Sequence, residues 1–167
     1  MNDVDAVTRL IDIARQLALS RPRFLDIKGA GHGDRDTSEF MRELRREIEA
    51  QLPGAKAEQR ICGKNSFAVD FFLPEQAAVV EVALSLRNSS TEFERDILKV
   101  LLAQDQGCNI KRLVFISKPG ALKRLGEPAP AAIIEWAKRR HDLVVEIHEI
   151  GAPAVQQRDE ADEARDR

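Results

Sequence analysis

The stretch Ser66–Leu84, SFAVDFFLPEQAAVVEVAL, decides the fold of this chain. Two mainly apolar runs, residues 66–73 and 77–84, flank Pro74-Glu75-Gln76, a sequence typical of a turn between antiparallel strands. Each run carries apolar residues at successive positions, so each strand is expected to bury both of its faces. Because a sheet that is buried on both faces needs helices on both sides, the stretch predicts two central strands of an α/β protein.

The same kinds of pattern continue on both sides of this hairpin. Apolar residues at helical spacing predict helices, and short runs of β-branched and aliphatic residues predict strands. The predicted helices cover residues 3–19, 37–52, 91–103 and 129–140, and the predicted strands cover residues 58–63, 66–73, 77–84, 112–117 and 143–150. This order predicts the α/β class, as a three-layer sandwich with a mixed central sheet.

The helix over residues 37–52 has an apolar stripe and an acidic stripe. The apolar stripe is expected at Met41, Leu44, Ile48 and Leu52, with Phe40 at its edge. Glu39, Glu43 and Glu47 lie four residues apart on a neighbouring stripe.

Length and composition favour one domain with a solvated surface. The chain has 167 residues, of which 43% are hydrophobic and 32% charged. We expect a single domain over residues 1–151 with an extra N-terminal helix, followed by a disordered charged tail over residues 152–167. No run is apolar and long enough for a signal peptide or a membrane span, which predicts a cytoplasmic protein without a membrane partner. Cys62 and Cys108 form no CxxC pair and are expected to be free, buried thiols.

Charge and aromatic content exclude little. The net charge is −2, from 26 basic and 28 acidic side chains, and only a local basic patch would argue for nucleic-acid binding. Aromatic residues are 5% of the chain and include no Tyr, which disfavours a stacking platform for single strands.

Asp70 and Glu81 are carboxylates in the middle of the two apolar strands, where burial is costly. If Glu75-Gln76 is the loop of the hairpin, Asp70 falls opposite Glu81, with Cβ atoms roughly 4.5–5.5 Å apart on one face. Two such acids are accommodated by a shared proton, a bound cation or a basic neighbour. Two carboxylates suit Mg²⁺ or Mn²⁺, and we favour this interpretation. The alternative is that each acid pairs with an arginine such as Arg60 or Arg87.

At these residues the chain resembles a known family, the restriction-endonuclease-like PD-(D/E)XK superfamily. The resemblance covers about residues 37–118: a helix, then Val69-Asp70, then Glu81-Val82-Ala83, then a helix and a strand. It implies an αβββαβ core and a Mg²⁺-dependent endonuclease that hydrolyses phosphodiester bonds in DNA. A homodimer is a further expectation from the resemblance.

The resemblance also implies roles for individual residues. Asp70 and Glu81 would bind the metal ion, together with the backbone carbonyl of Val82. An acid from the preceding helix often joins them in this family, and Glu43 and Glu47 are both candidates.

One position departs from the family motif. Ala83 stands where the family has a lysine, and alanine neither positions a water nor offsets phosphate charge. Lys99, on the polar stripe Glu92–Asp96–Lys99 of the following helix, is the predicted catalytic replacement, and Lys64 is a second candidate. Val69 replaces the proline that normally precedes the aspartate.

Lys64 and the loop Arg87-Asn88-Ser89 are the candidates for binding nucleic acid, since this loop leads into a helix N-terminus. Two other functions stay open at this point. A catalytically inactive member of the family would act as a nucleic-acid-binding or protein-interaction module, and Ala83 favours it. A small α/β scaffold would use the two acids only in salt bridges.

Overall fold

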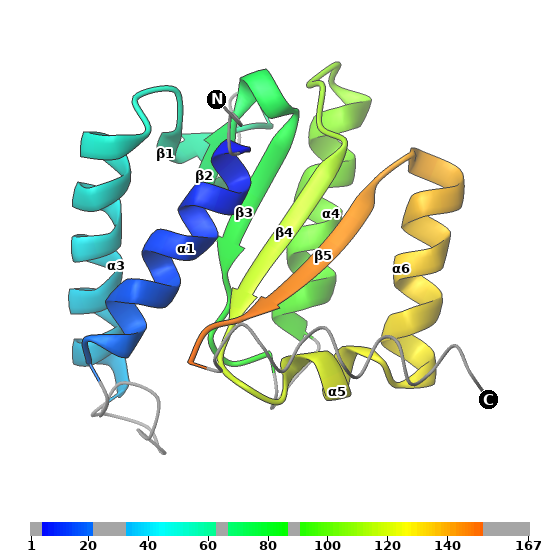
Figure 1. Ribbon diagram of the computed structural model, residues 1–167. Coiled ribbons are helices and arrows are strands. Elements are labelled where there is room, and N and C mark those ends of the chain that lie inside the picture. The colour runs from blue at the N-terminus through cyan, green and yellow to red at the C-terminus, as the bar shows by residue number, and fades with distance from the viewer. Residues whose placement is uncertain (1–4, 22–32, 63–66, 87–90, 152–167) are drawn as a thin grey trace.

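A mixed five-stranded sheet forms the centre of the protein in the computed structural model (Figure 1), which describes residues 5–21, 33–62, 67–86 and 91–151. The strand order is β1-β2-β3-β4-β5. β1 pairs antiparallel with β2 and β2 with β3, whereas β4 and β5 follow in parallel to β3. The strands are β1 (Lys56–Arg60), β2 (Ala68–Leu73), β3 (Ala78–Val82), β4 (Arg112–Ser117) and β5 (Val144–Glu149).

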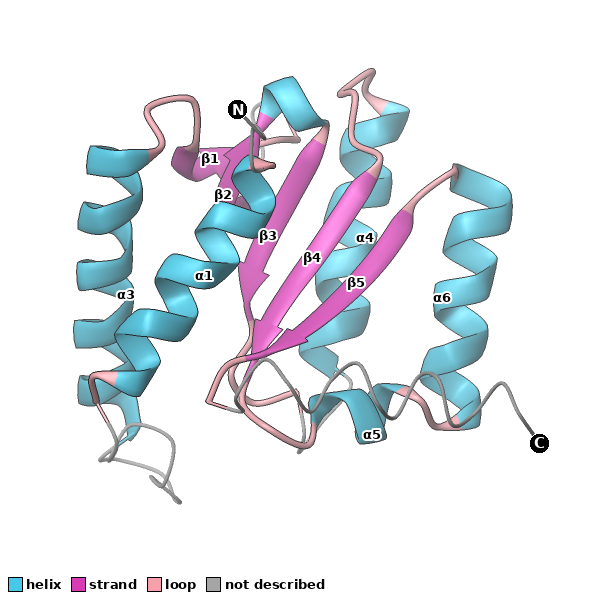
Figure 2. Cartoon of the chain, in the orientation of Figure 1, coloured by secondary structure: helices cyan, strands magenta, loops and turns pink. Residues whose placement is uncertain are grey.

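Helices cover both faces of this sheet, as Figure 2 shows. α1 and α3 pack on one face, and α4, α5 and α6 pack on the other. Their bounds are α1 (Ala6–Leu19), α3 (Gly33–Gln51), α4 (Thr91–Asp105), α5 (Ala121–Leu125) and α6 (Pro128–His141). The predicted α/β class with a mixed sheet is therefore confirmed, and no described helix has the length and apolar character needed to cross a bilayer.

Each face of the sheet has its own apolar core. On the first face, Leu10 of α1 and Leu44 of α3 pack over Phe71 and Val80. On the second face, the rings of Phe93 and Phe115 meet with centroids 5.5 Å apart. The second core also contains Cys62, which is a buried free thiol as predicted, while Cys108 is free and half-buried.

The predicted register of the central hairpin is correct, although its turn is not the predicted one. The pairs Phe71↔Val80, Phe72↔Val79 and Leu73↔Ala78 are those expected from the sequence. The connection is a short 3₁₀ helix, Pro74–Gln76, closed by Ala77 in the left-handed region at φ 47. This turn spans two more residues than the predicted loop and leaves the register unchanged.

Several predicted boundaries are wrong. α3 begins at Gly33 rather than at residue 37, and the first strand covers 56–60 rather than 58–63. α5 was not predicted, because five residues are too few to show a period. In α3 the buried stripe runs through Phe40, Leu44 and Ile48, while Met41 is only half-buried. Leu44 and Ile48 are buried as predicted, Met41 and Leu52 pack against the same core, and Phe40, predicted at the edge of the stripe, is fully buried. The expected tail over 152–167 lies outside the described residues.

Candidate functional site

Asp70 and Glu81 lie where β2 and β3 separate, which we call the fork. The regular pairing of these strands ends at Phe71↔Val80. Beyond it, the amide of Val82 donates to Asp70 Oδ2 at 2.8 Å, and the amide of Asp70 donates to Glu81 Oε2 at 3.2 Å. Each carboxylate therefore accepts a hydrogen bond from the opposite strand in place of a backbone carbonyl, which satisfies amides that the ladder no longer pairs.

The neighbouring ladder between β1 and β2 is interrupted at the same level. Ala57 pairs with Phe71 and Gln59 pairs with Val69, but Glu58 between them adopts a left-handed backbone at φ 48. This conformation is uncommon for a residue other than glycine and costs free energy. Asp70 is therefore flanked by irregular backbone on both sides, and its carboxylate is available to the groups around it.

Lys99 of α4 reaches the acid pair. Its ammonium lies 2.8 Å from Glu81 Oε1 and 2.8 Å from Asp96 Oδ1, and it donates to the carbonyl of Ala68 at 3.1 Å. Glu81, Asp96 and Lys99 are all buried. Because an ammonium group has three donors, these contacts use its full hydrogen-bonding capacity.

A pocket of about 240 Å³ opens over the fork. The sheet contributes both carboxylates, α3 contributes two side chains, and α4 contributes the polar stripe predicted from the sequence. The lining residues are Met41, Arg45, Ala68, Asp70, Glu81, Val82, Ala83, Glu92, Arg95, Asp96 and Lys99. The pocket is therefore lined from both faces of the sheet, by α3 on one face and by α4 on the other. The acid pair can be reached from both helices because β2 and β3 separate at this point.

Burial raises the pKa of two acids in this pocket, Asp70 and Glu81. The pKa of Glu81 is raised to about 8 by burial and by the nearby carboxylates of Asp70 and Asp96, against the opposing effect of Lys99. The pKa of Asp70 is also raised, chiefly by burial. Burial opposes the charge of Lys99, but Glu81 and Asp96 outweigh it and raise the pKa of the lysine. Glu81 and Asp96 are thus two buried carboxylates beside one buried ammonium, while Arg45 and Arg95 add positive charge in the same pocket.

Ala83 is buried beside the acid pair, on the same side of the strand as Glu81. Its amide donates to the carbonyl of Ile116 at 2.9 Å, and the Ser117 hydroxyl donates to the Ala83 carbonyl at 2.7 Å. These bonds hold the motif position in the sheet. Lys99 of the following helix places its ammonium 2.8 Å from Glu81, and its predicted catalytic role stays a prediction.

The two glutamates predicted from the preceding helix do not line the pocket. Glu43 forms ion pairs with Arg21 and Arg46, and Glu47 pairs with Arg46 at 3.2 Å. The side chains of α3 that line the pocket are instead Met41 and Arg45, which lie one turn apart on the helix. Arg60, offered in the salt-bridge alternative, is exposed at the end of β1.

Four other predicted residues lie outside the described ranges. They are Lys64, Arg87, Asn88 and Ser89, the candidates for nucleic-acid binding. Arg45, Arg95 and Asp96 are functional candidates that the sequence reasoning did not assign. Arg45 lies one helical turn from Met41, and Asp96 lies one turn from Lys99. This spacing could have identified them as lining residues only if the orientation of each helix had been known.

The donor set at the fork partly fits a divalent ion. Two adjacent carboxylates and a backbone carbonyl are typical protein ligands of Mg²⁺, which keeps several waters. A third carboxylate does not join them: over the described ranges, no three Asp, Glu, His or Cys side chains are grouped as metal ligands would be. Lys99 supplies the neighbouring positive charge instead.

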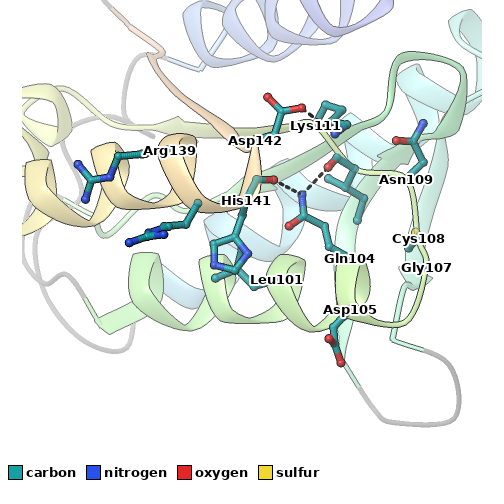
Figure 3. Close-up of a pocket in the computed structure, with 12 residues that line it drawn as sticks. Leu101, Gln104, Asp105, Gly107, Cys108, Asn109, Lys111, Arg139, His141 and Asp142 are labelled. Carbon is teal, nitrogen blue, oxygen red and sulfur yellow. Dashed lines mark hydrogen bonds and ion pairs between the residues drawn. The ribbon is translucent and has the colours of Figure 1, made fainter.

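A second, larger pocket of about 680 Å³ lies between the C-terminal ends of α4 and α6 (Figure 3). The Gln104 amide donates to the carbonyls of Ile110 at 2.7 Å and His141 at 3.2 Å, so it joins the two helix ends. Lys111 pairs with Asp142 at its rim. This pocket carries no opposed acids, and its polar contacts connect the elements around it.

Comparison of the chain with protein-family models, with curated proteins and with solved structures gave no match. The functional interpretation therefore depends on the geometry of the fork.

Proposed function

We propose that this protein is a metal-dependent nuclease that hydrolyses phosphodiester bonds in DNA. One observation carries the proposal: Asp70 and Glu81 meet at the fork, within one pocket that also contains the ammonium of Lys99. Two acids and a lysine in a cleft, with a carboxyl pKa shifted far from its usual range, are typical of a catalytic site. The element order α3-β1-β2-β3-α4-β4 matches the αβββαβ order of the restriction-endonuclease-like family.

Asp70, Glu81 and the carbonyl of Val82 would hold Mg²⁺ or Mn²⁺. When bound, such an ion polarises the scissile phosphate and lowers the pKa of a coordinated water. Lys99 supplies positive charge beside the acids, which offsets the charge of a phosphate. Asp96 holds the Lys99 ammonium in place at 2.8 Å, one turn back on the same helix.

Plasmid DNA tests the proposal directly. We expect nicking in Mg²⁺ or Mn²⁺ and none in EDTA, and Asp70→Asn should reduce the rate about a hundredfold or more. Asp12→Asn is the matched control, since Asp12 of α1 is outside the pocket and pairs with Arg15. Equal rates for the Asp70 and Asp12 variants would contradict the proposal.

A second function has an observation in its favour. Lys99 already pairs with Glu81 and Asp96, and Ala83 occupies the usual lysine position, so the acids are partly neutralised without a metal ion. This arrangement also suits a catalytically inactive protein that binds nucleic acid or another protein. Salt-dependent retention of DNA without cleavage would select it. A homodimer, measured by sedimentation, is expected for the nuclease so that both strands of a duplex are cut.

A further inference from the structure

Two arginines stand at the fork, one from each helix that borders it. Arg45 belongs to α3 and Arg95 to α4, and both line the pocket that contains Asp70 and Glu81. The charge of Arg45 acts on the Asp70 carboxyl and lowers its pKa against the larger effect of burial. The arginines thus place positive charge on two sides of a pocket whose floor is acidic.

Lys99 has no hydrogen-bonding capacity left for a phosphate. Its three donors are used by Glu81, Asp96 and the carbonyl of Ala68. A phosphate that enters this pocket therefore needs its hydrogen bonds from other groups. A guanidinium has five donors in a planar arrangement that matches a phosphate, so Arg45 and Arg95 are the suitable groups among the described lining residues.

Both arginines are held by contacts that an anion can replace. Arg45 Nη1 lies 2.8 Å from Glu58 Oε1, and the Glu58 side chain is 64% exposed. Arg45 Nε is enclosed and has no hydrogen-bond partner in the described part of the chain. Arg95, with a side chain 59% exposed, lies 3.5 Å from Asp96 and 3.9 Å from Glu92. The Arg45–Glu58 and Arg95–Glu92 pairs are partly exposed and contribute little to stability, and the contact of Arg95 with the buried Asp96 is long, so exchanging these contacts for a phosphate is inexpensive.

We propose that Arg45 and Arg95 bind the phosphates on either side of the phosphodiester that faces Asp70 and Glu81. The inference rests on the proposed function, because it takes nucleic acid as the ligand. Arg45 of α3 would bind the phosphate on one side of the scissile phosphodiester, and Arg95 of α4 would bind the phosphate on the other side. The backbone of the substrate then crosses the fork from one helix to the other.

The salt dependence of binding measures this directly. A fluorescent DNA duplex of about 20 base pairs is titrated in EDTA, which prevents metal-dependent cleavage, at several salt concentrations. Each lost phosphate contact should reduce the slope of log K against log[salt] by about 0.9. We expect this reduction for Arg45→Gln and for Arg95→Gln, and about twice this reduction for the double variant. Arg45→Lys should keep the slope but bind more weakly, since lysine cannot form the paired contact.

Arg46→Gln is the matched control. Arg46 follows Arg45 on α3, has a side chain 70% exposed, and pairs with Glu43 and Glu47 away from the pocket. Arg46→Gln removes one positive charge, as Arg45→Gln does, and should leave the slope of log K against log[salt] unchanged. If wild-type protein binds DNA and all four Gln variants keep the wild-type slope, the arginine assignment is wrong while the proposed function stands. If wild-type protein neither binds nor cleaves DNA, the proposed function fails and the assignment fails with it.

Discussion

Two ionic clusters in this protein use the same kinds of side chain and differ in burial and in balance. At the fork, Glu81 and Asp96 pair with one cation, Lys99, and these three side chains are buried, while Asp70 beside them is half-buried. On the sheet face near the start of α1, Arg112 pairs with Glu146 at 2.8 Å and with Asp5 at 3.1 Å, and His148 lies 3.4 Å from Glu146. This second group, the sheet-face cluster, is half-buried.

The two clusters shift the pKa of their glutamates in opposite directions. In the sheet-face cluster, hydrogen bonding from His148 and then from Arg112 lowers the pKa of Glu146 to about 2. At the fork, burial and neighbouring carboxylates raise the pKa of Glu81 to about 8. A balanced, partly solvated cluster stabilises its charges, whereas a buried cluster with excess acid carries a cost that a structural role does not require. This contrast between Glu81 and Glu146 is one of the observations that support the proposed function at the fork.

Removing the cation from the fork should have the largest effect. Lys99→Met leaves Glu81 buried without its ammonium partner and leaves Asp96 only the longer contact with Arg95 at 3.5 Å, so we expect a loss of about 3–5 kcal/mol in the free energy of unfolding. Urea denaturation at pH 7.5 measures it, with Lys123→Met on exposed α5 as the control. Mn²⁺ should recover part of the lost stability, because an added cation replaces the ammonium. If Lys99→Met is as stable as Lys123→Met, the buried fork does not depend on its cation more than the sheet-face cluster does, and the comparison fails.

The pH dependence of stability should separate the clusters next. Glu81 has a raised pKa, so the folded state holds its proton more tightly and stability falls as pH rises from about 4.5 to about 8. Glu146 has a lowered pKa, so its contribution is present above about 4.5 and is lost as pH falls toward 2. We expect the Glu81 effect to amount to about 2 kcal/mol, within the limit of ~1.4 kcal/mol per pH unit for one proton. Urea titrations from pH 3 to 8.5 measure the free energy of unfolding over both pH ranges. A free energy of unfolding that stays constant between about pH 4.5 and 8 would contradict the raised pKa of Glu81.

Asp70→Asn should sharpen the comparison by reducing like charge at the fork. The asparagine still accepts from the Val82 amide, while repulsion of Glu81 is removed. In EDTA we expect a gain of about 1 kcal/mol at pH 8 and a smaller gain at pH 5, where Glu81 already carries a proton. Thermal unfolding at the two pH values measures this difference. If Asp70→Asn is less stable than the wild type at pH 8, the negative charge of Asp70 is already compensated by neighbouring groups and does not destabilise the fork.

The smallest effect is expected in the sheet-face cluster. Glu146→Gln removes one carboxylate from a balanced, partly exposed group, so we expect a loss of about 0.5–1 kcal/mol at pH 7. The same variant should abolish the acid limb attributed to Glu146 and leave DNA cleavage unchanged. Denaturation at pH 3 and pH 7 provides the measurement. A loss as large as that of Lys99→Met would show that the two clusters are equivalent.

The central hairpin and Lys99 could be predicted from the sequence because local patterns determine them. Two apolar runs and one turn specify which residues of β2 and β3 face one another, and helical spacing carries Lys99 to the same side as Glu92 and Asp96. The role of α3 could not be predicted, because its orientation depends on packing. Phe40, Leu44 and Ile48 repeat every four residues, but this apolar pattern does not say which neighbouring polar side chains reach the fork: Arg45, one turn after Met41, lines the pocket, and Glu43 does not.

The left-handed backbone of Glu58 has a consequence for local stability. β1 is an edge strand with mostly exposed side chains, and this residue breaks its ladder at the level of Asp70. Edge segments with interrupted pairing open at a lower free energy than the rest of a domain. Amide hydrogens of β1 should therefore exchange with deuterium faster than those of β3 and β4, and brief opening of this strand would admit solvent to the fork while the two cores stay packed.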